Sequence, residues 1–283
     1  MKSDVNLIKA QKTAGQAARA AGALMRNNLR AVKRASSVTQ HDIKLELDVR
    51  CQKLIERKLL ATFPQVAVLG EEGDSGKADA QYRWVVDPID GTVNFAYGIP
   101  HACVSIALQT RSAERGARNV FRKGAAGHAP RIAHHVTLLG VVYDPFQDEL
   151  WTAIRGQPAR LNGRPIRVSK RSRLGEAVIS IGFTKSPDDI EKTLPYFGWL
   201  VRRVRKLRMM GAAALGLVYV ATGRFDAYLE RGVSLWDIAA GGLIVECAGG
   251  EFWHRTVEGK LKYRMVANNG LLRRKLKAGN LLK

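Results

Sequence analysis

The sequence predicts an α+β protein, because segments with helical periodicity alternate with short apolar runs typical of strands. Three observations carry this prediction. Residues 1–34 place apolar side chains at helical spacing, and the apolar run Trp84 to Val86 is typical of a buried strand. The dipeptide Asn162-Gly163 is a strong signal for a two-residue hairpin turn between strands.

The first segment, residues 1–34, is rich in Lys and Arg and has Asp4 as its one acidic residue. This composition is shared by organelle transit peptides. An amphipathic helix is the alternative that we favour, because seven apolar residues fall on roughly one face, namely Ile8, Ala14, Ala18, Ala21, Met25, Leu29 and Val32.

The stretch Asp42 to Asp48 leads into a second predicted helix, which has apolar residues at helical spacing from Cys51 to Leu60 and which Pro64 ends. The apolar run Val66 to Leu69 then predicts a strand. The next four residues are Gly70-Glu71-Glu72-Gly73, so the two glutamates lie in the loop where this strand ends.

The central stretch reads Trp-Val-Val-Asp-Pro-Ile-Asp-Gly-Thr-Val-Asn-Phe, from Trp84 to Phe95. We expect the strand to stop at Asp87-Pro88, since proline has no amide hydrogen for a sheet ladder. Asp87 and Asp90 then converge across the turn, and two buried like charges require a cation between them. Gly91-Thr92 is suited to opening a short helix, whose free amides favour an anion such as phosphate.

The apolar run Ala102 to Leu108 predicts a further strand. The composition then changes over residues 109–136, where Arg, Ala, Gly and His predominate and the apolar periodicity of a packed element is missing. We expect this basic segment to be a long mobile loop within a single domain that spans residues 1–283.

Regular patterns resume after the basic segment. Leu138 to Tyr143 and Glu149 to Ile154 predict a hairpin that turns at Asp144-Pro145. A strand from Ala177 to Ile181 precedes Ser186-Pro187-Asp188-Asp189, a favourable helix opening. This helix should run to about Val201.

The last third of the chain begins with a basic run at Arg202–Arg208. We interpret this run as a solvent-exposed face at the end of a helix. Gly211 opens a helix of small residues, and a strand from Arg224 should end at Glu230. Asp237 stands at the start of the apolar helical run Leu235–Gly242, where a carboxylate complements the helix dipole. The tail from Leu271 to Lys283 predicts a basic helix.

Bulk composition narrows the class of protein. Its 283 residues, 46% of them hydrophobic, can form a sizeable core. No apolar run approaches the ~20 residues that span a bilayer, so we expect no membrane association. Cys51, Cys103 and Cys247 match neither a disulfide framework nor a zinc pattern, which indicates buried reduced thiols in a cytoplasmic protein.

Taken together, three motifs resemble those of the inositol monophosphatase family of metal-dependent, lithium-sensitive sugar phosphatases. They are the Gly-Glu-Glu at Gly70, the Asp-Pro-Ile-Asp-Gly-Thr-x-Asn-Phe at Asp87, and the Trp-Asp-x-Ala-Ala-Gly at Trp236. Their order and separation fit, and the resemblance extends from about Val5 to Ala267. It implies a layered αβαβα sandwich, with the basic segment 109–136 as an insertion.

The resemblance also implies a site for two or three Mg²⁺ ions, with Mn²⁺ as an alternative. The implied ligands are Glu71, Asp87, the Ile89 carbonyl, Asp90 and Asp237. Oxygen ligands of this kind suit Mg²⁺ or Mn²⁺ better than zinc. The implied catalytic residues are Glu71, Thr92 and Asp48, with Asp48 supporting the Thr92 hydroxyl as it orients the attacking water. The segment before Asp48 departs from the family, because Lys44-Leu45 replaces an apolar residue and a threonine.

A small phosphorylated polyol or sugar is the implied substrate, hydrolysed without a covalent phosphoenzyme. Asp90, Gly91, Thr92, Gly211, Ala213 and Glu230 match the family's substrate-binding positions. Inositol monophosphate is our first choice and fructose 1,6-bisphosphate the second, while histidinol phosphate, nucleotide 3′-phosphates and NADP remain alternatives. Members of the family are commonly homodimers.

A hypothesis of another class rests on charge alone. Lys and Arg number 46 against 25 acidic residues, a formal net charge of +21 that attracts anions, nucleic acid included. The chain would then be an RNA-binding or transcription-associated factor with incidental phosphatase activity. No aromatic-rich RNA-binding motif accompanies the basic residues.

Overall fold

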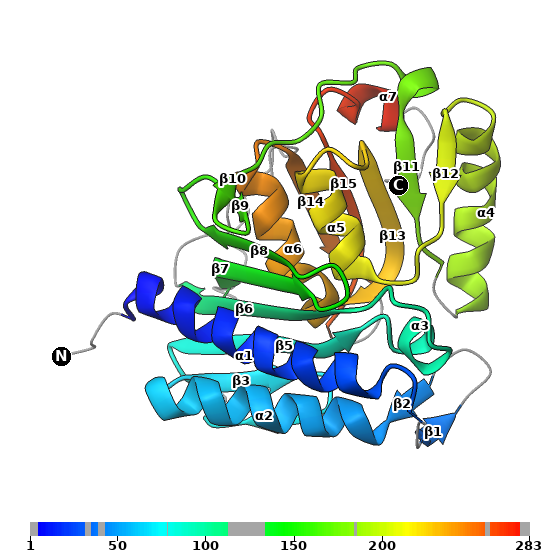
Figure 1. Ribbon diagram of the computed structural model, residues 1–283. Helices are drawn as coiled ribbons and strands as arrows, with labels where there is room; N and C mark the ends of the chain where they lie inside the picture. The colour runs from blue at the N-terminus through cyan, green and yellow to red at the C-terminus, as the bar shows by residue number, and fades with distance from the viewer. Residues whose placement is uncertain are drawn as a thin grey trace.

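Two β-sheets alternate with pairs of helices in five layers (Figure 1), which confirms the predicted αβαβα sandwich. The computed structural model describes residues 5–31, 35–38, 43–77, 79–112, 134–183, 186–257 and 261–277. Its helices are α1 (Leu7–Asn28), α2 (Glu46–Thr62), α3 (Thr92–Ala96), α4 (Pro187–Val201), α5 (Ala213–Ala221), α6 (Leu235–Cys247) and α7 (Arg273–Lys277), with a 3₁₀ turn at Leu174–Glu176.

The first sheet has the strand order β10-β9-β8-β7-β6-β5-β3-β4 within the described residues. All its neighbouring strands are antiparallel except β3 and β5, which are parallel. The strands are β3 (Ala67–Gly70), β4 (Gly73–Ser75), β5 (Tyr82–Asp90), β6 (Cys103–Ser112), β7 (His134–Asp144), β8 (Glu149–Ile154), β9 (Arg160–Leu161) and β10 (Arg164–Pro165). A separate ribbon pairs β1 (Ala35–Val38) with β2 (Ile43–Leu45).

The second sheet has the order β12-β11-β13-β15-β14. Strand β11 runs parallel to both of its neighbours, whereas β13, β15 and β14 are mutually antiparallel. The strands are β11 (Val178–Ile181), β12 (Lys206–Arg208), β13 (Ala227–Ser234), β14 (Glu251–Thr256) and β15 (Lys262–Asn268).

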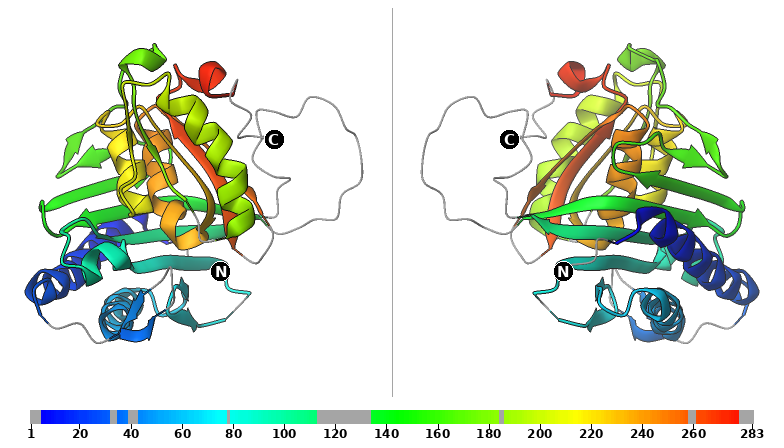
Figure 2. Two further views of the ribbon diagram at one scale, coloured as in Figure 1. Left: turned by 90° about the vertical axis from the view of Figure 1, so that its right-hand side faces the viewer. Right: turned by 90° about the vertical axis from the view of Figure 1, so that its left-hand side faces the viewer.

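Three apolar cores hold the layers together, and Figure 2 shows the layers from two sides. The first core lies between α1, α2 and the large sheet, and the third lies between α4, α7 and the small sheet. The middle core surrounds α5 and α6, which are apolar on all sides because a sheet covers each face. At Gly140 on β7 an added Cβ would lie 2.6 Å from the Ala240 carbonyl oxygen, so glycine permits the close approach of α6.

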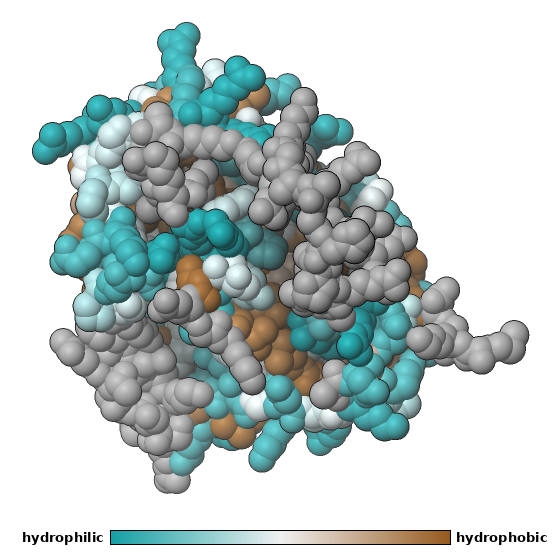
Figure 3. All heavy atoms as spheres, turned by 180° about the vertical axis from the view of Figure 1, so that it is seen from behind, coloured by the Kyte–Doolittle hydropathy of each residue, from teal (hydrophilic) through white to brown (hydrophobic). Residues whose placement is uncertain are grey.

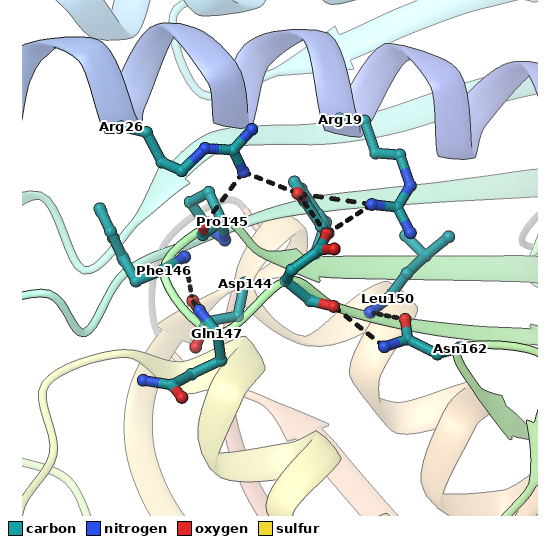
Figure 4. Close-up of polar contacts among 10 residues, drawn as sticks. Arg19, Arg26, Asp144, Pro145, Phe146, Gln147, Leu150 and Asn162 are labelled. Carbon is teal, nitrogen blue, oxygen red and sulfur yellow. Dashed lines mark hydrogen bonds and ion pairs between the residues drawn. The ribbon is translucent and has the colours of Figure 1, made fainter.

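Helix α1 is an integral part of the fold, which confirms the helix interpretation of the N-terminal segment. Nine of its residues are buried, and it packs against α2 and β7. Arg26 donates hydrogen bonds to the Tyr143 hydroxyl at 2.8 Å and to the Pro145 carbonyl at 3.0 Å. Arg19 forms an ion pair with Asp148 at 2.6 Å. Both arginines reach from the helix toward the β7–β8 hairpin (Figure 4).

The turn predictions made from short-range sequence chemistry are confirmed. Asn162 and Gly163 both have positive φ, 47° and 81°, as a two-residue type I′ hairpin between β9 and β10 requires. The Asp144 carboxylate accepts the Phe146 amide at 2.8 Å in the β7–β8 turn. Ser186 caps α4, and Pro187 occupies its first turn.

Four strands extend beyond their predicted ends. Strand β5 does not stop at Asp87-Pro88 but continues to Asp90, because a β-bulge accommodates the proline. Strand β13 continues past Glu230 to Ser234. Strands β6 and β7 include residues 109–112 and 134–136, so the ends of the predicted basic loop are paired strand. The rest of that prediction, residues 113–133, lies outside the described residues, as does the tail beyond Lys277.

Cys51 and Cys103 are buried, Cys247 is half-buried, and all three are free thiols, as predicted. Among the described residues, no helix combines the length and apolar character that crossing a membrane requires. Hydrophilic side chains cover much of the coloured rear surface, and an apolar patch interrupts them near its centre (Figure 3).

Asp226 is a buried junction that the sequence did not reveal. Its carboxylate is fully buried and accepts the Val178 amide at 2.8 Å and the Arg171 Nε at 2.7 Å, together with the Ser169 hydroxyl. It therefore ties the segment before β11, β11 itself and the entry to β13 into one network.

Replacing Asp226 with Ala should lower the free energy of unfolding by about 3 kcal/mol, because a buried amide, a hydroxyl and a guanidinium lose their shared acceptor. Urea denaturation would measure the change, with Asp79→Ala as the control, since Asp79 is exposed. A loss no larger than that of the control would contradict the role assigned to Asp226.

Candidate active site

A cavity of about 1540 Å³ opens where the end of β5 faces the starts of α5 and α6. Of the catalytic, metal-binding and substrate-binding residues that the family resemblance implies, all but Asp48 line this cavity. The lining includes Glu71, Asp87, Ile89, Asp90, Gly91, Thr92, Gly211, Ala213, Glu230 and Asp237. The structure therefore brings together three motifs that are far apart in the sequence.

Glu71 and Asp87 lie side by side because β3 and β5 are parallel neighbours. Gly70 pairs with Val86, and the Glu71 amide donates to the Val86 carbonyl at 3.2 Å. The residue that follows each member of this pair carries a carboxyl group, and these two groups hydrogen-bond to each other. Two carboxyl groups in this arrangement must share a proton or hold a cation between them.

The β-bulge at Pro88 and Ile89 determines where Asp90 points. In a regular strand, residues three apart face opposite sides of the sheet. Here Asp87 pairs with Ser105 and Asp90 pairs with Cys103, so three steps on β5 match two steps on β6. The extra residue places Asp87 and Asp90 on the same face, which brings both carboxylates toward the cavity.

Asp90 is held by backbone donors at the start of α5. Its two oxygens accept the Ala213 amide at 2.9 Å and the Ala214 amide at 2.8 Å. The Cys103 thiol lies 3.5 Å from Oδ2. Burial and the negative charge of Asp237 raise the pKa of Asp90 to about 7, although the two amides act in the opposite direction.

Asp237 occupies the first turn of α6, as predicted. Its carboxylate accepts the Ser234 amide at 2.7 Å, which fixes the start of the helix. The same charge acts on its neighbours, because burial first and then Asp237 raise the pKa of Glu71 to about 8. Burial and the charges of Glu71, Asp90 and Asp237 also raise the pKa of Asp87 well above its usual range.

These carboxylates offer a donor set that fits a hard divalent cation. All are oxygen donors, and each keeps lone pairs beyond those used in its own hydrogen bonds. As they stand, no three His, Cys, Asp or Glu side chains within the described residues are grouped closely enough to hold an ion.

Gly91 and Thr92 form the turn after Asp90. Gly91 has φ 90°, and an added Cβ would lie 2.9 Å from the His101 carbonyl oxygen, so glycine is required there. The Thr92 hydroxyl donates to the Ile89 carbonyl at 2.8 Å. Asp48 is buried at the start of α2, where it accepts the Leu45 amide at 2.7 Å, and its charge acts on Glu71. Support of Thr92 by Asp48 stays a prediction.

Gly211, Ala213 and Glu230, the remaining implied substrate-binding residues, also line the cavity. Gly211 has φ 72° and lines the cavity, while the Ala213 amide is engaged by Asp90. The Tyr228 hydroxyl donates to the Glu230 carboxylate, and burial raises the pKa of Glu230 to about 7. A Cβ at Gly182 would lie 2.0 Å from that carboxylate, so glycine makes room for it.

Sequence reasoning missed several supporting residues. Asn94 donates to the carbonyls of His101 at 2.9 Å and Met210 at 2.8 Å, which joins the turn after β5 to the entry of α5. Its place in the central motif was the available signal. Cys103 and Gly182 carry no such signal, because they adjoin Asp90 and Glu230, which lie in other segments. Tyr228 is two residues from Glu230, but it belongs to none of the motifs.

Comparison with known proteins places this arrangement in a familiar group. A sequence model described as the inositol monophosphatase family matches residues 6–114 and 132–281. The protein named Nus factor SuhB from Pseudomonas aeruginosa is 39% identical over 246 residues, which are 83% of this chain and 81% of that protein. The protein named inositol-1-monophosphatase from Rhizobium meliloti is 38% identical over 220 residues, 77% of this chain and 73% of that one.

A solved structure shows the same likeness in three dimensions. The structure of the extragenic suppressor protein suhB from Bartonella henselae superimposes with a TM-score of 0.81 at 33% sequence identity. The match covers 95% of this chain and 96% of that one. The layered architecture thus belongs to a fold with known members.

Without divalent ions, the stability of the protein should fall as the pH rises from about 5 to about 8. The raised pKa values of Glu71 and Asp90 mean that the folded protein binds more protons than the unfolded chain across this range, so each pH increase favours unfolding. Urea denaturation in EDTA at several pH values would measure the slope.

The variant Asp90→Asn should flatten this slope, because one titrating carboxyl group is removed. Asp79→Asn, a change at an exposed position, should leave it as it is. Stability that rises over the same pH range would show that the carboxyl groups do not repel one another in the folded state.

Proposed function

The chain belongs to the inositol monophosphatase family and is a phosphomonoester hydrolase, and we propose that it is a Mg²⁺-dependent phosphatase acting on inositol monophosphate. The observation that carries the proposal is the convergence of Glu71, Asp87, Asp90 and Asp237 on one cavity. The family is metal-dependent. For this chain we propose two or three Mg²⁺ ions, replaceable by Mn²⁺, and inhibition by lithium.

The residues that would hold the ions are the four carboxylates and the Ile89 carbonyl, whose second lone pair stays available beside its bond to Thr92. When bound, the ions would neutralise the phosphoryl oxygens, lower the pKa of the attacking water and stabilise the leaving alkoxide. The hard oxygen donors match this choice of ion.

The chain's own groups would orient the substrate and the water. Thr92 stands beside the Ile89 carbonyl and can accept a hydrogen bond from water while its proton remains engaged. The amides of Gly91 and Thr92, at the start of α3, would hold phosphate oxygens. Asp90 cannot move freely, because two amides of α5 hold it. This fixed position supports its two proposed roles, as a metal ligand and as a substrate-binding residue.

The polyol would lie against Gly211, Ala213 and Glu230. Glu230 is anchored by Tyr228 and faces the cavity, so its carboxylate can accept a hydrogen bond from a ring hydroxyl. Inositol monophosphate is therefore the first choice. Fructose 1,6-bisphosphate, histidinol phosphate, nucleotide 3′-phosphates and NADP are the alternatives within the family.

Two further properties belong to the proposal. We expect a homodimer, because members of the family commonly form one, and a cytoplasmic location, in keeping with three free thiols. Size-exclusion chromatography with light scattering would determine the oligomeric state directly.

The first test is phosphate release from inositol, fructose, histidinol and nucleotide phosphates, each with Mg²⁺, with Mg²⁺ plus lithium, and with EDTA. We expect turnover that needs Mg²⁺ and falls with lithium, fastest on inositol monophosphate. Asp90→Asn should reduce kcat by about a thousandfold or more while the protein stays folded, and Asp79→Asn should match the wild type. Activity of Asp90→Asn within tenfold of wild type would refute its assigned role.

A second candidate function is a transcription-associated role through RNA. It is favoured by the net charge of +21 and by relatives that carry the name Nus factor SuhB. Binding of this kind should weaken steeply with salt, because phosphate contacts release counterions. Filter retention of labelled RNA over a salt series would measure it, and no retention at low salt would exclude RNA binding by the isolated protein.

A further inference from the structure

The turn that carries Glu71 is held from two sides. It joins β3 to β4 and consists of Gly70, Glu71, Glu72 and Gly73, with Gly70 paired to Gly73. On one side, the Glu71 amide donates to the Val86 carbonyl of β5 at 3.2 Å. On the other side lies α2, which runs beside β3 near one edge of the large sheet (Figure 1). Gln52 of α2 reaches the turn from this side.

The Gln52 carboxamide bonds the turn through both of its polar atoms. Its Oε1 accepts the Glu72 amide at 2.9 Å, and its Nε2 donates to the Gly73 carbonyl at 2.9 Å. Nε2 also donates to the Glu56 carboxylate at 2.8 Å. Only this orientation of the carboxamide satisfies all three partners, because the amide needs an oxygen and the carbonyl needs an N–H. Gln52 is 4% exposed, so water competes little for these bonds.

Gly70 makes this contact possible. A Cβ added at position 70 would lie 2.4 Å from both the Oε1 and the Nε2 atoms of Gln52, so the carboxamide occupies the space that a side chain would need. The φ angle of Gly70 is not positive, so backbone strain does not require glycine here. Close packing of the Gln52 side chain against the turn is the reason that remains.

Gln52 is fixed by the helix that carries it. Asp48, Gln52 and Glu56 are spaced four residues apart, which places them on one face of α2. Ile55, on the neighbouring face, is fully buried in the core that α1, α2 and the large sheet share. Because this core determines the position of α2, Gln52 links the turn to a rigid part of the fold.

The Glu71 turn needs such a link. Two of its four residues are glycines, and the strand that follows, β4, is three residues long and lies last in the strand order of the large sheet. Burial, followed by the negative charges of neighbouring acids, raises the pKa of Glu71 to about 8. In the absence of a cation, these charges repel the ionised Glu71 carboxylate. A loosely held turn would carry Glu71 away from the other acids and would have to be ordered again when an ion binds.

We propose that Gln52 is a positioning residue for cation binding, which holds the turn so that the Glu71 carboxylate stays beside Asp87. The inference rests on the proposed metal-dependent function, because Glu71 is one of the implied ligands. A carboxamide suits this role, since it supplies a donor and an acceptor and adds no negative charge beside the acids. With the backbone held, only the side-chain torsions of Glu71 adjust to an ion, so less conformational entropy is lost on binding.

The first measurement is cation binding without substrate. Mn²⁺, titrated into the full-length protein by calorimetry, should bind Gln52→Met about tenfold more weakly than wild type, because partners that orient a metal ligand contribute that much to affinity. Methionine is flexible enough to fill the space but cannot make the three hydrogen bonds. The comparison uses the binding that Asp87→Asn removes, since Asp87 is an implied ligand. The matched control is Ile55→Val, a buried change on the same helix, which should bind Mn²⁺ as wild type does.

The second measurement distinguishes positioning from general damage to the fold. The Mg²⁺ concentration that gives half-maximal turnover of inositol monophosphate should rise about tenfold in Gln52→Met, while kcat at saturating Mg²⁺ should stay within about twofold of wild type. A merely structural role would lower kcat through loss of folded protein and leave the Mg²⁺ dependence unchanged. Gly70→Ala is the second variant, because its Cβ displaces the Gln52 carboxamide from the other side. It should shift the Mg²⁺ dependence in the same direction even if Gln52→Met does not fold.

The outcomes separate this inference from the proposed function. Weaker Mn²⁺ binding by Gln52→Met, in a protein that releases phosphate from no substrate, would support the role of Gln52 and refute the phosphatase. Equal Mn²⁺ binding by wild type, Gln52→Met and Gly70→Ala would overturn the role of Gln52 and leave the phosphatase proposal standing. If no Mn²⁺ binding depends on Asp87, both proposals are wrong.

Discussion

Mutual repulsion among four acidic side chains is the constraint on which the rest of the structure depends. Glu71, Asp87, Asp90 and Asp237 come from three separate stretches of sequence, and their pKa shifts show that they act on one another. Bringing such charges together requires donors or cations nearby. The chain supplies backbone amides from α5 to Asp90 and from the start of α6 to Asp237. The remaining charge is what a divalent ion would neutralise.

The layered fold is what makes these donors available. Helices α5 and α6 lie between the two sheets, and their apolar surfaces are covered on all sides, so their positions are fixed by the middle core rather than by the site. Close contacts such as that of Gly140 with the Ala240 backbone keep α6 against β7. The start of each helix can then present rigid amides or a carboxylate at the cavity. Because these groups are already ordered, little conformational entropy is lost when a ligand binds. Stability built far from the cavity thus determines the geometry within it.

The sequence could predict those parts of the fold that depend on local chemistry. The Asn162-Gly163 turn, the Ser186-Pro187 helix start and the metal-site motifs each carry a recognisable pattern, and the family resemblance extended these to the five-layered sandwich. Prediction from the sequence failed where the end of a strand depends on its partner strand. Proline was expected to end β5, but its neighbour β6 accommodates a bulge, and this bulge is what turns Asp90 toward Asp87. Asp226 shows the same limit, because its partners Arg171 and Val178 lie about fifty residues away in the sequence.

The negative charge of the four carboxylates has a consequence for ligand binding. A phosphate ester approaching the bare carboxylates is repelled, so its attraction to this part of the cavity depends on bound cations. The β5 bulge and two amides of α5 determine where Asp90 lies, and the start of α6 determines where Asp237 lies. In the proposed arrangement the positions of the ions, and of the phosphate that they attract, would therefore follow from strand register and helix starts that are present before any ligand binds.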